Sequence, residues 1–385
     1  MEFLRLIAMA CVIATLFYYA AATLMALRFA RRRTTPPGPL PAKPPGITVL
    51  KPLHGLSRTL ADNLGSYLEL SYPRVQYLFA VASAEDRAIE APLALKTRYP
   101  SANIDIVVGE EPGCANHKVA KLIRMAEQAS AETEAFVLSD ADIVVEPDHL
   151  RRVAAELFER DDTGIVTCLY RGRAGDSLGS KLEALFVNTD FAPMVLLSEA
   201  IEPMRHALGA TIAVKRKALD AIGGFLPLRN LLADDFYLGR MVADKGFGVR
   251  LSSSLVTIAP DEAAFSQFWN HQLRWARTYR TVRPASLATI IIHGPFWAIL
   301  LALFCSFSAV SIATLAAVVL ARYAMAATMI TKVLDLPASF GDLWIVPLKD
   351  LVMTGIYFAG LAGNTVLWGG RRFKLIPGGA MRELG

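Results

Sequence analysis

Charged residues are scarce in this chain. Only 19% of its 385 residues are Asp, Glu, Lys or Arg, whereas 54% are hydrophobic. The apolar excess gathers toward the two ends, a distribution typical of a globular middle part between membrane segments. A chain of this length accommodates about two structural units.

The chain also has few cysteines and lacks basic stripes of the kind that bind nucleic acid. The four cysteines, Cys11, Cys114, Cys168 and Cys305, are scattered without metal-type spacing, so neither a disulfide framework nor a zinc site is expected. No basic stripe is interleaved with aromatic residues, and nucleic acid is therefore not an expected partner. The net charge of +5 comes partly from arginines beside the apolar segments, which favours contact with anionic lipid headgroups.

The N-terminal part predicts a transmembrane anchor over residues 1–33. The stretch from Leu6 to Leu27 carries no charge and is long enough to cross a bilayer. Arg28 and the three arginines at 31–33 follow it, and the positive-inside tendency places them in the cytoplasm. A cleaved signal peptide is the alternative, but the basic cluster lies on the wrong side of the apolar run. The proline-rich residues 34–45 then predict a stiff linker.

Residues 284–370 predict C-terminal membrane helices, and residues 371–385 a basic cytoplasmic tail. The apolar run 286–330 is long enough for two helices with a break at His293, Gly294 and Pro295, and a third run covers 351–367. Three full crossings would leave the basic tail outside, against the charge bias. We therefore expect either the segment around Pro295 or the stretch 344–350 to lie in the membrane interface.

The middle part, residues 46–283, predicts an α/β domain. Short β-rich runs alternate with helical patterns, which is typical of a mostly parallel, Rossmann-like sheet with crossover helices. The expected strands are 47–50, 76–82, 104–108, 135–138 and 164–169, and the expected helices include 57–70, 87–99, 117–129 and 147–159. Asp86 follows the second strand and Asp140 the fourth, so both are expected at one crevice.

An Asp-x-Asp pattern follows the fourth expected strand. Asp140 and Asp142 come directly after the apolar run 135–138. Carboxylates in this position suit a hard divalent cation, Mg²⁺ or Mn²⁺, that also binds diphosphate oxygens. This indicates a nucleotide-sugar site. The alternative is a helix cap and a solvated turn residue.

Asp86 and Lys118 each have two possible roles. Asp86 is expected either to accept hydrogen bonds from a base or ribose, or to cap the helix that follows it. Lys118 lies at a helix start, where a cation is unfavourable to the helix dipole, and this indicates a contact with diphosphate. The alternative for Lys118 is a solvated side chain.

Two later motifs carry the remaining chemistry. Asp234 and Asp235 are adjacent acids in apolar surroundings. Burial would raise the pKa of Asp235 and let it act as general base, while Asp234 holds neighbouring groups in place. Residues 271–280 repeat cationic and aromatic side chains at helical spacing, so Arg274 can pair with a departing diphosphate and Trp275 can flank a sugar or lipid. A basic helix on the membrane face is the alternative for this segment.

The order of these motifs resembles that of membrane-bound inverting glycosyltransferases with the GT-A fold, and within them the ceramide glucosyltransferase-like branch. The resemblance extends nearly from end to end. A C-terminal basic segment, 368–379, is also similar. The motifs that carry the resemblance are Lys51 to Gly55, Asn63-Leu64, Tyr72-Pro73, Asp86, Asn116 with Lys118, Ser139 to Asp142, Gly209 to Thr211, Gly223 to Phe225, Ala233 to Asp235, and Arg274-Trp275.

The resemblance implies a role for each site residue. It assigns the uridine contact to Asp86, the metal and diphosphate to Asp140 and Asp142, the base to Asp235, the RW motif to Arg274 and Trp275, and the acceptor side to Gly209, Thr211 and Asp190. His271 stands where similar enzymes commonly have Gln or Arg; a histidine can still bind diphosphate, with a charge that depends on pH. Asp190 stands at about the place of Ser-His-Pro in animal ceramide glucosyltransferases, which is a departure from the pattern for ceramide.

The resemblance therefore implies a multi-pass enzyme of the inner (cytoplasmic) membrane with its catalytic domain on the cytoplasmic side. It would transfer one sugar, glucose or N-acetylglucosamine, from a UDP-sugar to a lipid hydroxyl with inversion. Ceramide is one membrane lipid acceptor, and a hopanoid is the other, as in similar bacterial proteins. A processive polysaccharide synthase is a rival, although few membrane segments are available for a channel. An inactive membrane scaffold is the non-enzymatic alternative, and it needs none of the four acids Asp86, Asp140, Asp142 and Asp235.

Overall fold

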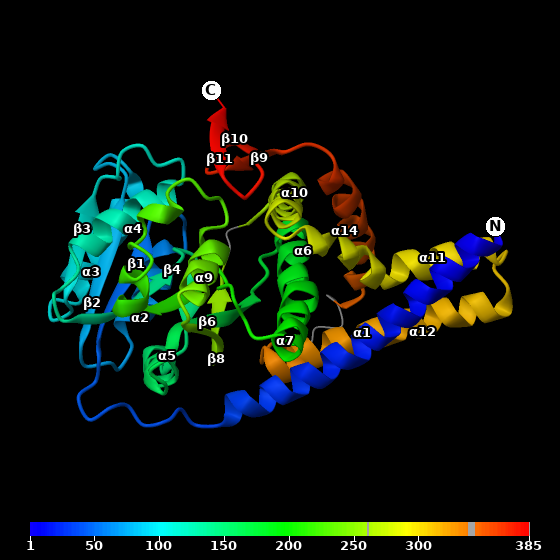
Figure 1. The fold of residues 1–385 in the computed structure, drawn as a ribbon, viewed down its shortest axis with the longest axis horizontal. Helices are drawn as coiled ribbons and strands as arrows, with labels where there is room; N and C mark the ends of the chain where they lie inside the picture. Colours follow the sequence, from blue (N-terminus) through cyan, green and yellow to red (C-terminus); the bar gives the residue numbers. More distant parts are fainter. Residues whose placement is uncertain (260–261, 338–342, 385) are drawn as a thin grey trace.

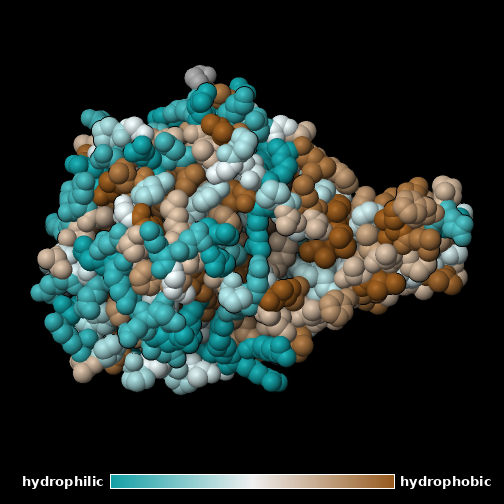
Figure 2. All heavy atoms as spheres, in the orientation of Figure 1, coloured by the Kyte–Doolittle hydropathy of each residue, from teal (hydrophilic) through white to brown (hydrophobic). Residues whose placement is uncertain are grey.

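The computed structural model describes residues 1–259, 262–337 and 343–384. An α/β domain forms one end of the molecule, and a rod built from helices α1 (Glu2–Thr34), α11 (Gly294–Phe304) and α12 (Ala309–Thr328) projects from it (Figure 1). Hydrophobic residues gather along the rod, whereas the face of the α/β domain in the same view is mostly hydrophilic (Figure 2). The α/β fold with apolar terminal helices is confirmed.

An eight-stranded sheet forms the core of the α/β domain. Its order is β3-β2-β1-β4-β7-β6-β8-β5, with β1 parallel to β2 and β4, and β7 antiparallel to both of its neighbours. Strands β1, β2 and β4 are buried almost throughout, which is typical of parallel strands covered on both faces. The strands are β1 (Gly46–Pro52), β2 (Val75–Val81), β3 (Ile104–Val108), β4 (Thr133–Ser139), β5 (Ile143–Val145), β6 (Thr163–Gly172), β7 (Thr211–Lys215) and β8 (Gly248–Ile258).

Short helices link the strands. Helix α4 illustrates why they form: the Asn116 side chain accepts a hydrogen bond from the Val119 amide at 3.0 Å and caps the helix, while Leu122 and Met125 face the core. A cap and an apolar stripe thus set both the start of the helix and its packing face. The connecting helices are α2 (Leu60–Leu68), η1 (Arg87–Ile89), α3 (Glu90–Arg98), α4 (His117–Glu127), α5 (His149–Phe158), α8 (Arg216–Asp220), η3 (Leu226–Leu228) and α9 (Asp234–Asp244).

Every strand expected from the sequence is present, but β5, β7 and β8 were not expected. Strand β8 contains three consecutive serines, 252–254, and all three are buried. Polar residues interrupt the apolar run that marks a buried strand in sequence. Glu156 compensates for their burial, since its carboxylate accepts a hydrogen bond from the Ser253 amide at 2.9 Å.

Among the described residues, three helical segments are long and apolar enough to cross a membrane: Glu2–Thr34, Leu178–Ile201 and Ala309–Val333. The second was not expected. It consists of α6 (Leu178–Phe186), the π-helix η2 (Val187–Phe191) and α7 (Ala192–Ile201). It packs on β6, α1 and α10 (Phe265–Val282), and more than half of its most apolar stretch is buried within the protein. Its apolar character therefore serves contacts inside the protein.

The expected break at His293, Gly294 and Pro295 is confirmed. The 3₁₀ segment η4 (Pro284–Ile292) meets α11 at a bend of 56°. A Cβ atom on Gly294 would lie 2.6 Å from the Tyr19 hydroxyl oxygen. The absence of a side chain at Gly294 thus lets α11 pack closely on α1.

The C-terminal part differs from the expected pattern. Helix α12 continues into η5 (Met329–Val333), and α14 (Val346–Leu361) packs on α10 and α11. Helix α14 ends at Leu361, and the chain beyond forms an antiparallel sheet of β9 (Thr365–Trp368), β10 (Arg371–Leu375) and β11 (Met381–Leu384). Its apolar side chains pack with Leu232. The segment expected as a basic tail is therefore a small folded sheet.

Candidate active site

Lys118 joins two acidic motifs that are distant in sequence. Its Nζ lies 2.6 Å from Asp140 Oδ1 and 3.8 Å from Asp234 Oδ2. Burial disfavours its charge, but the two carboxylates outweigh burial and raise the pKa of Lys118. The side chain is only 18% exposed. Lys118 is therefore not the solvated surface residue of the alternative interpretation.

Asp140 and Asp142 lie at the end of β4, near the centre of the sheet. Burial and the charge of Asp140 raise the pKa of Asp142 to about 6. Within the described ranges, no group of three or more His, Cys, Asp or Glu side chains is arranged to hold a metal ion. Two carboxylates nevertheless fit Mg²⁺ or Mn²⁺ that takes its other ligands from substrate phosphate and water.

Lys51 is a site residue whose function sequence reasoning missed. It is fully buried on β1, and its Nζ donates to the Asp140 carbonyl at 2.9 Å and to Ser139 Oγ at 3.3 Å. Burial, opposed by the charges of Asp142 and Asp140, lowers the pKa of Lys51 to about 7. Lys51 thus binds the Asp-x-Asp turn from its buried side. The sequence signal for this role was a lysine inside an otherwise apolar strand.

Asp234 and Asp235 begin helix α9 next to Lys118. Asn116 Nδ2 donates to Asp234 Oδ1 at 3.3 Å, which fixes the first carboxylate. Burial and the neighbouring charge of Asp234 raise the pKa of Asp235 to about 6. A Cβ atom on Gly209 would lie 2.8 Å from Asp235 Oδ2, so the absence of a side chain at residue 209 lets the carboxylate adopt this position.

Helix α10 brings the RW motif to the same side of the domain. In the described part of the chain, the Arg274 guanidinium makes no hydrogen bond or ion pair, and burial lowers its pKa. The Trp275 ring contacts Phe186 and Phe191, with centroids 5.8 and 5.7 Å away. His271 Nδ1 lies 2.8 Å from Glu183 Oε1. His271 is therefore held by a carboxylate that the sequence reading did not identify.

Asp86 caps a helix in this structure. Its Oδ1 accepts hydrogen bonds from the Ala88 amide at 3.0 Å and from the Gly55 amide at 3.1 Å. The prediction that Asp86 caps the following helix is thus confirmed. The bond to Gly55 also ties the turn after β1 to the end of β2.

The three expected acceptor-side residues are in different environments. Gly209 lies against Asp235. Thr211 is fully buried on β7 and donates to Ser139 Oγ at 3.3 Å, so its side chain lies behind the site instead of facing an acceptor. Asp190 lies on η2 and forms ion pairs with Arg322 and Lys349.

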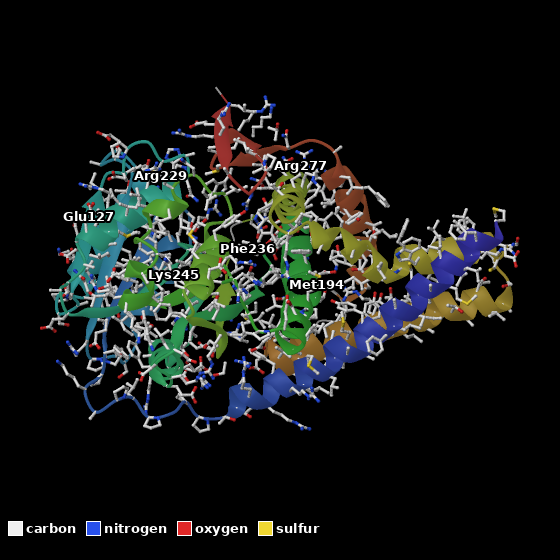
Figure 3. All side chains as sticks on the ribbon, in the orientation of Figure 1. Glu127, Met194, Arg229, Phe236, Lys245 and Arg277 are labelled. Carbon is white, nitrogen blue, oxygen red and sulfur yellow. The ribbon has the colours of Figure 1, made fainter. Side chains whose placement is uncertain are left out.

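The C-terminal sheet holds the segment that precedes Asp234. The Met381 amide donates to the Asn230 carbonyl at 2.9 Å, and the Leu232 amide donates to Gly379 at 3.2 Å. Arg277 on α10 lies beside the sheet (Figure 3) and donates to the Thr365 carbonyl at 2.5 Å. Between α10 and the sheet lies a cleft of about 340 Å³ lined by Asn270, Leu273, Arg274, Arg277, Thr365, Val366, Leu367 and Arg372.

A second cleft of about 310 Å³ adjoins the start of α9. Phe236, the neighbour of Asp235, lines it and is labelled in Figure 3. The other walls come from the end of α7, from the segment 202–206, and from the junction of α10 with η4. The cleft therefore extends from helix α9 to the side of the domain from which the apolar helices leave.

Comparisons by sequence agree with this geometry. Residues 6–381 match the model of glycosyl transferase family 21. Ceramide glucosyltransferase 1 of Caenorhabditis elegans is 23% identical over 346 residues, which covers 88% of this chain and 73% of that protein. Ceramide glucosyltransferase 3 of the same organism is 24% identical over 251 residues, or 65% of this chain, and the match spans only 53% of that relative.

A comparison by structure supports the same fold. The mannosyltransferase PcManGT from Pyrobaculum calidifontis, solved in complex with GDP-Man and Mn²⁺, superposes with a TM-score of 0.54 at 18% identity, covering 93% of this chain and 99% of that chain. This likeness concerns the fold and agrees with the GT-A architecture expected from the sequence. Because the family model covers nearly the whole chain, this protein belongs to glycosyl transferase family 21.

Proposed function

We propose that this protein transfers a single hexose, glucose or N-acetylglucosamine, from a UDP-sugar to a hydroxyl group of a membrane lipid, with inversion at the anomeric carbon. The observation that carries the proposal is the position of Lys118 between Asp140 and Asp234. This lysine brings residues suited to a diphosphate next to residues suited to a base. The names of the worm relatives support a glycolipid as the product.

Asp235 supplies the general base in this proposal. A pKa of about 6 leaves its carboxylate ionised at neutral pH, yet basic enough to take the proton of an attacking hydroxyl. The deprotonated lipid oxygen forms the new bond to the anomeric carbon as the bond to UDP breaks on the opposite face. An α-linked UDP-sugar therefore gives a β-glycoside.

Lys118 and Arg274 stabilise the departing UDP, because negative charge grows on its diphosphate as the bond breaks. Arg274 suits this role since its guanidinium has no partner among the described residues. A divalent cation bound by Asp140 and Asp142 would neutralise further diphosphate charge. Asp86 would meet the uridine at the end of β2, with its cap bonds holding the carboxylate in place.

The lipid acceptor would enter through the cleft beside Phe236. Phe236, which follows the proposed base in sequence, lines this cleft, and the cleft reaches the junction of α10 with η4, where the chain turns into the apolar helices. The arginines at the end of α1 favour a cytoplasmic position for the catalytic domain. Two of them contact that domain: Arg32 pairs with Glu199 at 2.9 Å, and Arg33 pairs with Glu146 at 3.5 Å.

Incubation of the purified protein with several UDP-sugars tests the proposal directly. Ceramide, diacylglycerol and a hopanoid polyol serve as separate acceptors, and mass spectrometry identifies the products. We expect one lipid to gain a single hexose or N-acetylhexosamine. A polymeric product would instead identify a polysaccharide synthase, and the absence of any glycolipid with every acceptor would contradict the proposal.

A further inference from the structure

Four charged side chains meet at the junction of the apolar helices with the catalytic domain. The Arg322 guanidinium on α12 donates to both carboxylate oxygens of Asp350 on α14, at 2.8 and 2.9 Å. Lys349 pairs with Asp350 at 2.6 Å and also with Asp190. Arg322 is 3% exposed and Lys349 fully buried. Two cations thus face two anions, as buried charges require.

Arg322 also holds the π-helix η2. It donates to the Thr189 carbonyl at 2.8 Å, to Thr189 Oγ1 at 3.2 Å and to Asp190 Oδ1 at 3.1 Å. A guanidinium can serve these acceptors and Asp350 together because its five donors are fixed in one plane. The contacts fix two consecutive residues of η2 to a membrane-side helix.

The next residue, Phe191, connects η2 to the candidate active site. Its ring stacks on Tyr170 with centroids 4.5 Å apart and contacts Trp275 at 5.7 Å. Trp275 directly follows Arg274, the residue proposed to meet the diphosphate. Any displacement of η2 therefore moves the aromatic surface on which Trp275 rests, because packed aromatic rings leave no space for independent shifts.

We infer that Arg322 is a positioning residue for the transfer reaction: by binding Thr189 and Asp190, it sets the place of Phe191 and Trp275 and thereby shapes the acceptor side of the site. This inference rests on the proposed function. It also makes acceptor use depend on how α12 and α14 pack in the membrane. The sequence does not show this dependence, since the contacts of Arg322 come from residues far away in the chain.

The test variant is Arg322→Met combined with Asp350→Asn. Removing one cation together with one anion keeps the remaining charges balanced, which avoids an uncompensated buried carboxylate. Lys349 and Asp190 still form their pair in this variant. The bonds from residue 322 to η2 are lost.

The control is Arg33→Met combined with Asp335→Asn. It removes the ion pair of Arg33 with Asp335 at 2.6 Å and the longer pair of Arg33 with Glu146 at 3.5 Å, and Glu146 keeps Arg171 as a partner at 3.3 Å. Neither Arg33 nor Asp335 contacts η2 or Trp275 among the described contacts. Both double variants are purified as full-length protein in detergent. Glucose transfer from UDP-glucose to ceramide, or to whichever acceptor the product analysis identifies, is then measured over a range of acceptor concentrations.

We expect the Arg322 double variant to raise the acceptor KM on the order of tenfold, while its affinity for UDP, measured by titration, stays unchanged. The control should keep both constants. A second readout needs no substrate: acrylamide quenching of Trp275 fluorescence, obtained as the difference between each protein and its Trp275→Phe counterpart. Quenching should increase in the Arg322 double variant only.

Equal acceptor KM values in the two double variants, or unchanged quenching of Trp275 in the Arg322 variant, would overturn the inference. If no acceptor is glycosylated by the native protein, the proposed function fails, and the quenching result still decides whether Arg322 positions Trp275. The conservative variant Arg322→Lys retains the charge but not the planar set of donors. Compared with the Arg322 double variant, Arg322→Lys should regain native folding stability but keep an acceptor KM above the native value. If only the charge of Arg322 mattered, the acceptor KM would return to the native value.

Discussion

Lys118 Nζ lies 2.6 Å from Asp140 Oδ1 and forms an ion pair between the first turn of α4 and the end of β4. Replacing Lys118 with Met removes the cation that faces both Asp140 and Asp234. We expect kcat/KM for the UDP-sugar to fall by roughly 10²-fold, because a charge aimed at the leaving group is lost. Steady-state kinetics with varied UDP-sugar measures the effect.

Lys121→Met is the matched control for Lys118. Lys121 lies on the same helix and pairs with Glu110 at 2.8 Å, and among the described contacts it forms no ion pair with Asp140, Asp142, Asp234 or Asp235. Its loss should lower thermal stability but leave kcat/KM unchanged. Equal kinetic losses in both variants would show that Lys118 acts only through the stability of α4.

Asp235→Asn tests the proposed base. The amide keeps the size of the side chain but cannot take a proton, so transfer should fall by about 10²- to 10⁴-fold. Binding of UDP, followed by calorimetric titration, should be retained. Asp220→Asn, at the exposed end of α8, serves as the control and should be fully active. A purified Asp235→Asn enzyme with native transfer rates would rule out this residue as the base.

The pH dependence of transfer should report the same carboxylate. Burial and Asp234 raise the pKa of Asp235 to about 6, and only the ionised form accepts a proton. The rate should therefore be constant well above pH 6 and fall tenfold per pH unit below it. Asp142 also has its pKa raised to about 6, so the profile is measured at saturating Mg²⁺ or Mn²⁺, which keeps that carboxylate ionised. Constant activity down to pH 5 would contradict the assignment.

The C-terminal sheet should contribute to activity through Tyr237. The Tyr237 hydroxyl donates to the Gly378 carbonyl at 2.6 Å, and a Cβ atom on Gly379 would lie 2.6 Å from Cε2 of the same ring. Gly379→Ala should displace Tyr237 and the start of α9, lowering both the melting temperature and kcat.

Gly378→Ala separates this effect from backbone strain. Gly378 and Gly379 have φ values of 84° and 81°, but no atom lies within 4 Å of a Cβ placed on Gly378. Both substitutions therefore cost about 1 kcal/mol of strain at positive φ, and only Gly379→Ala adds the clash. Identical kcat values in the two variants would show that the sheet does not act on α9.

Local sequence patterns predicted much of the fold. The apolar run 135–138 predicted a buried strand, and β4 is buried at those residues. The break at Gly294 was predicted because a Gly-Pro pair cannot continue a helix, and the chain bends there. By contrast, serines interrupt the apolar pattern of β8, and the apolar run of β7 extends only from Ile212 to Val214, so these strands were missed.

The candidate site shows the same division. Adjacent acids and an Asp-x-Asp pattern marked Asp140, Asp142, Asp234 and Asp235 without any structure. Thr211 was expected on the acceptor side, but its side chain is buried behind Ser139. Asp190, also expected there, forms ion pairs with Arg322 and Lys349, which its local sequence does not indicate. The role of a buried polar side chain depends on its partners, which come from distant parts of the chain. A local sequence pattern contains no information on those partners.

Periodicity and composition over a few consecutive positions were enough to predict the apolar helices near the two ends of the chain, the parallel strands β1 to β4 and the identity of the acidic residues. The folded structure was needed to see that Lys118 bridges Asp140 and Asp234, that Lys51 lies beneath the Asp-x-Asp turn, and that Arg322 binds η2. These relationships depend on contacts between segments far apart in the chain. They arise when the sheet and the membrane helices pack together and force buried charges to find partners.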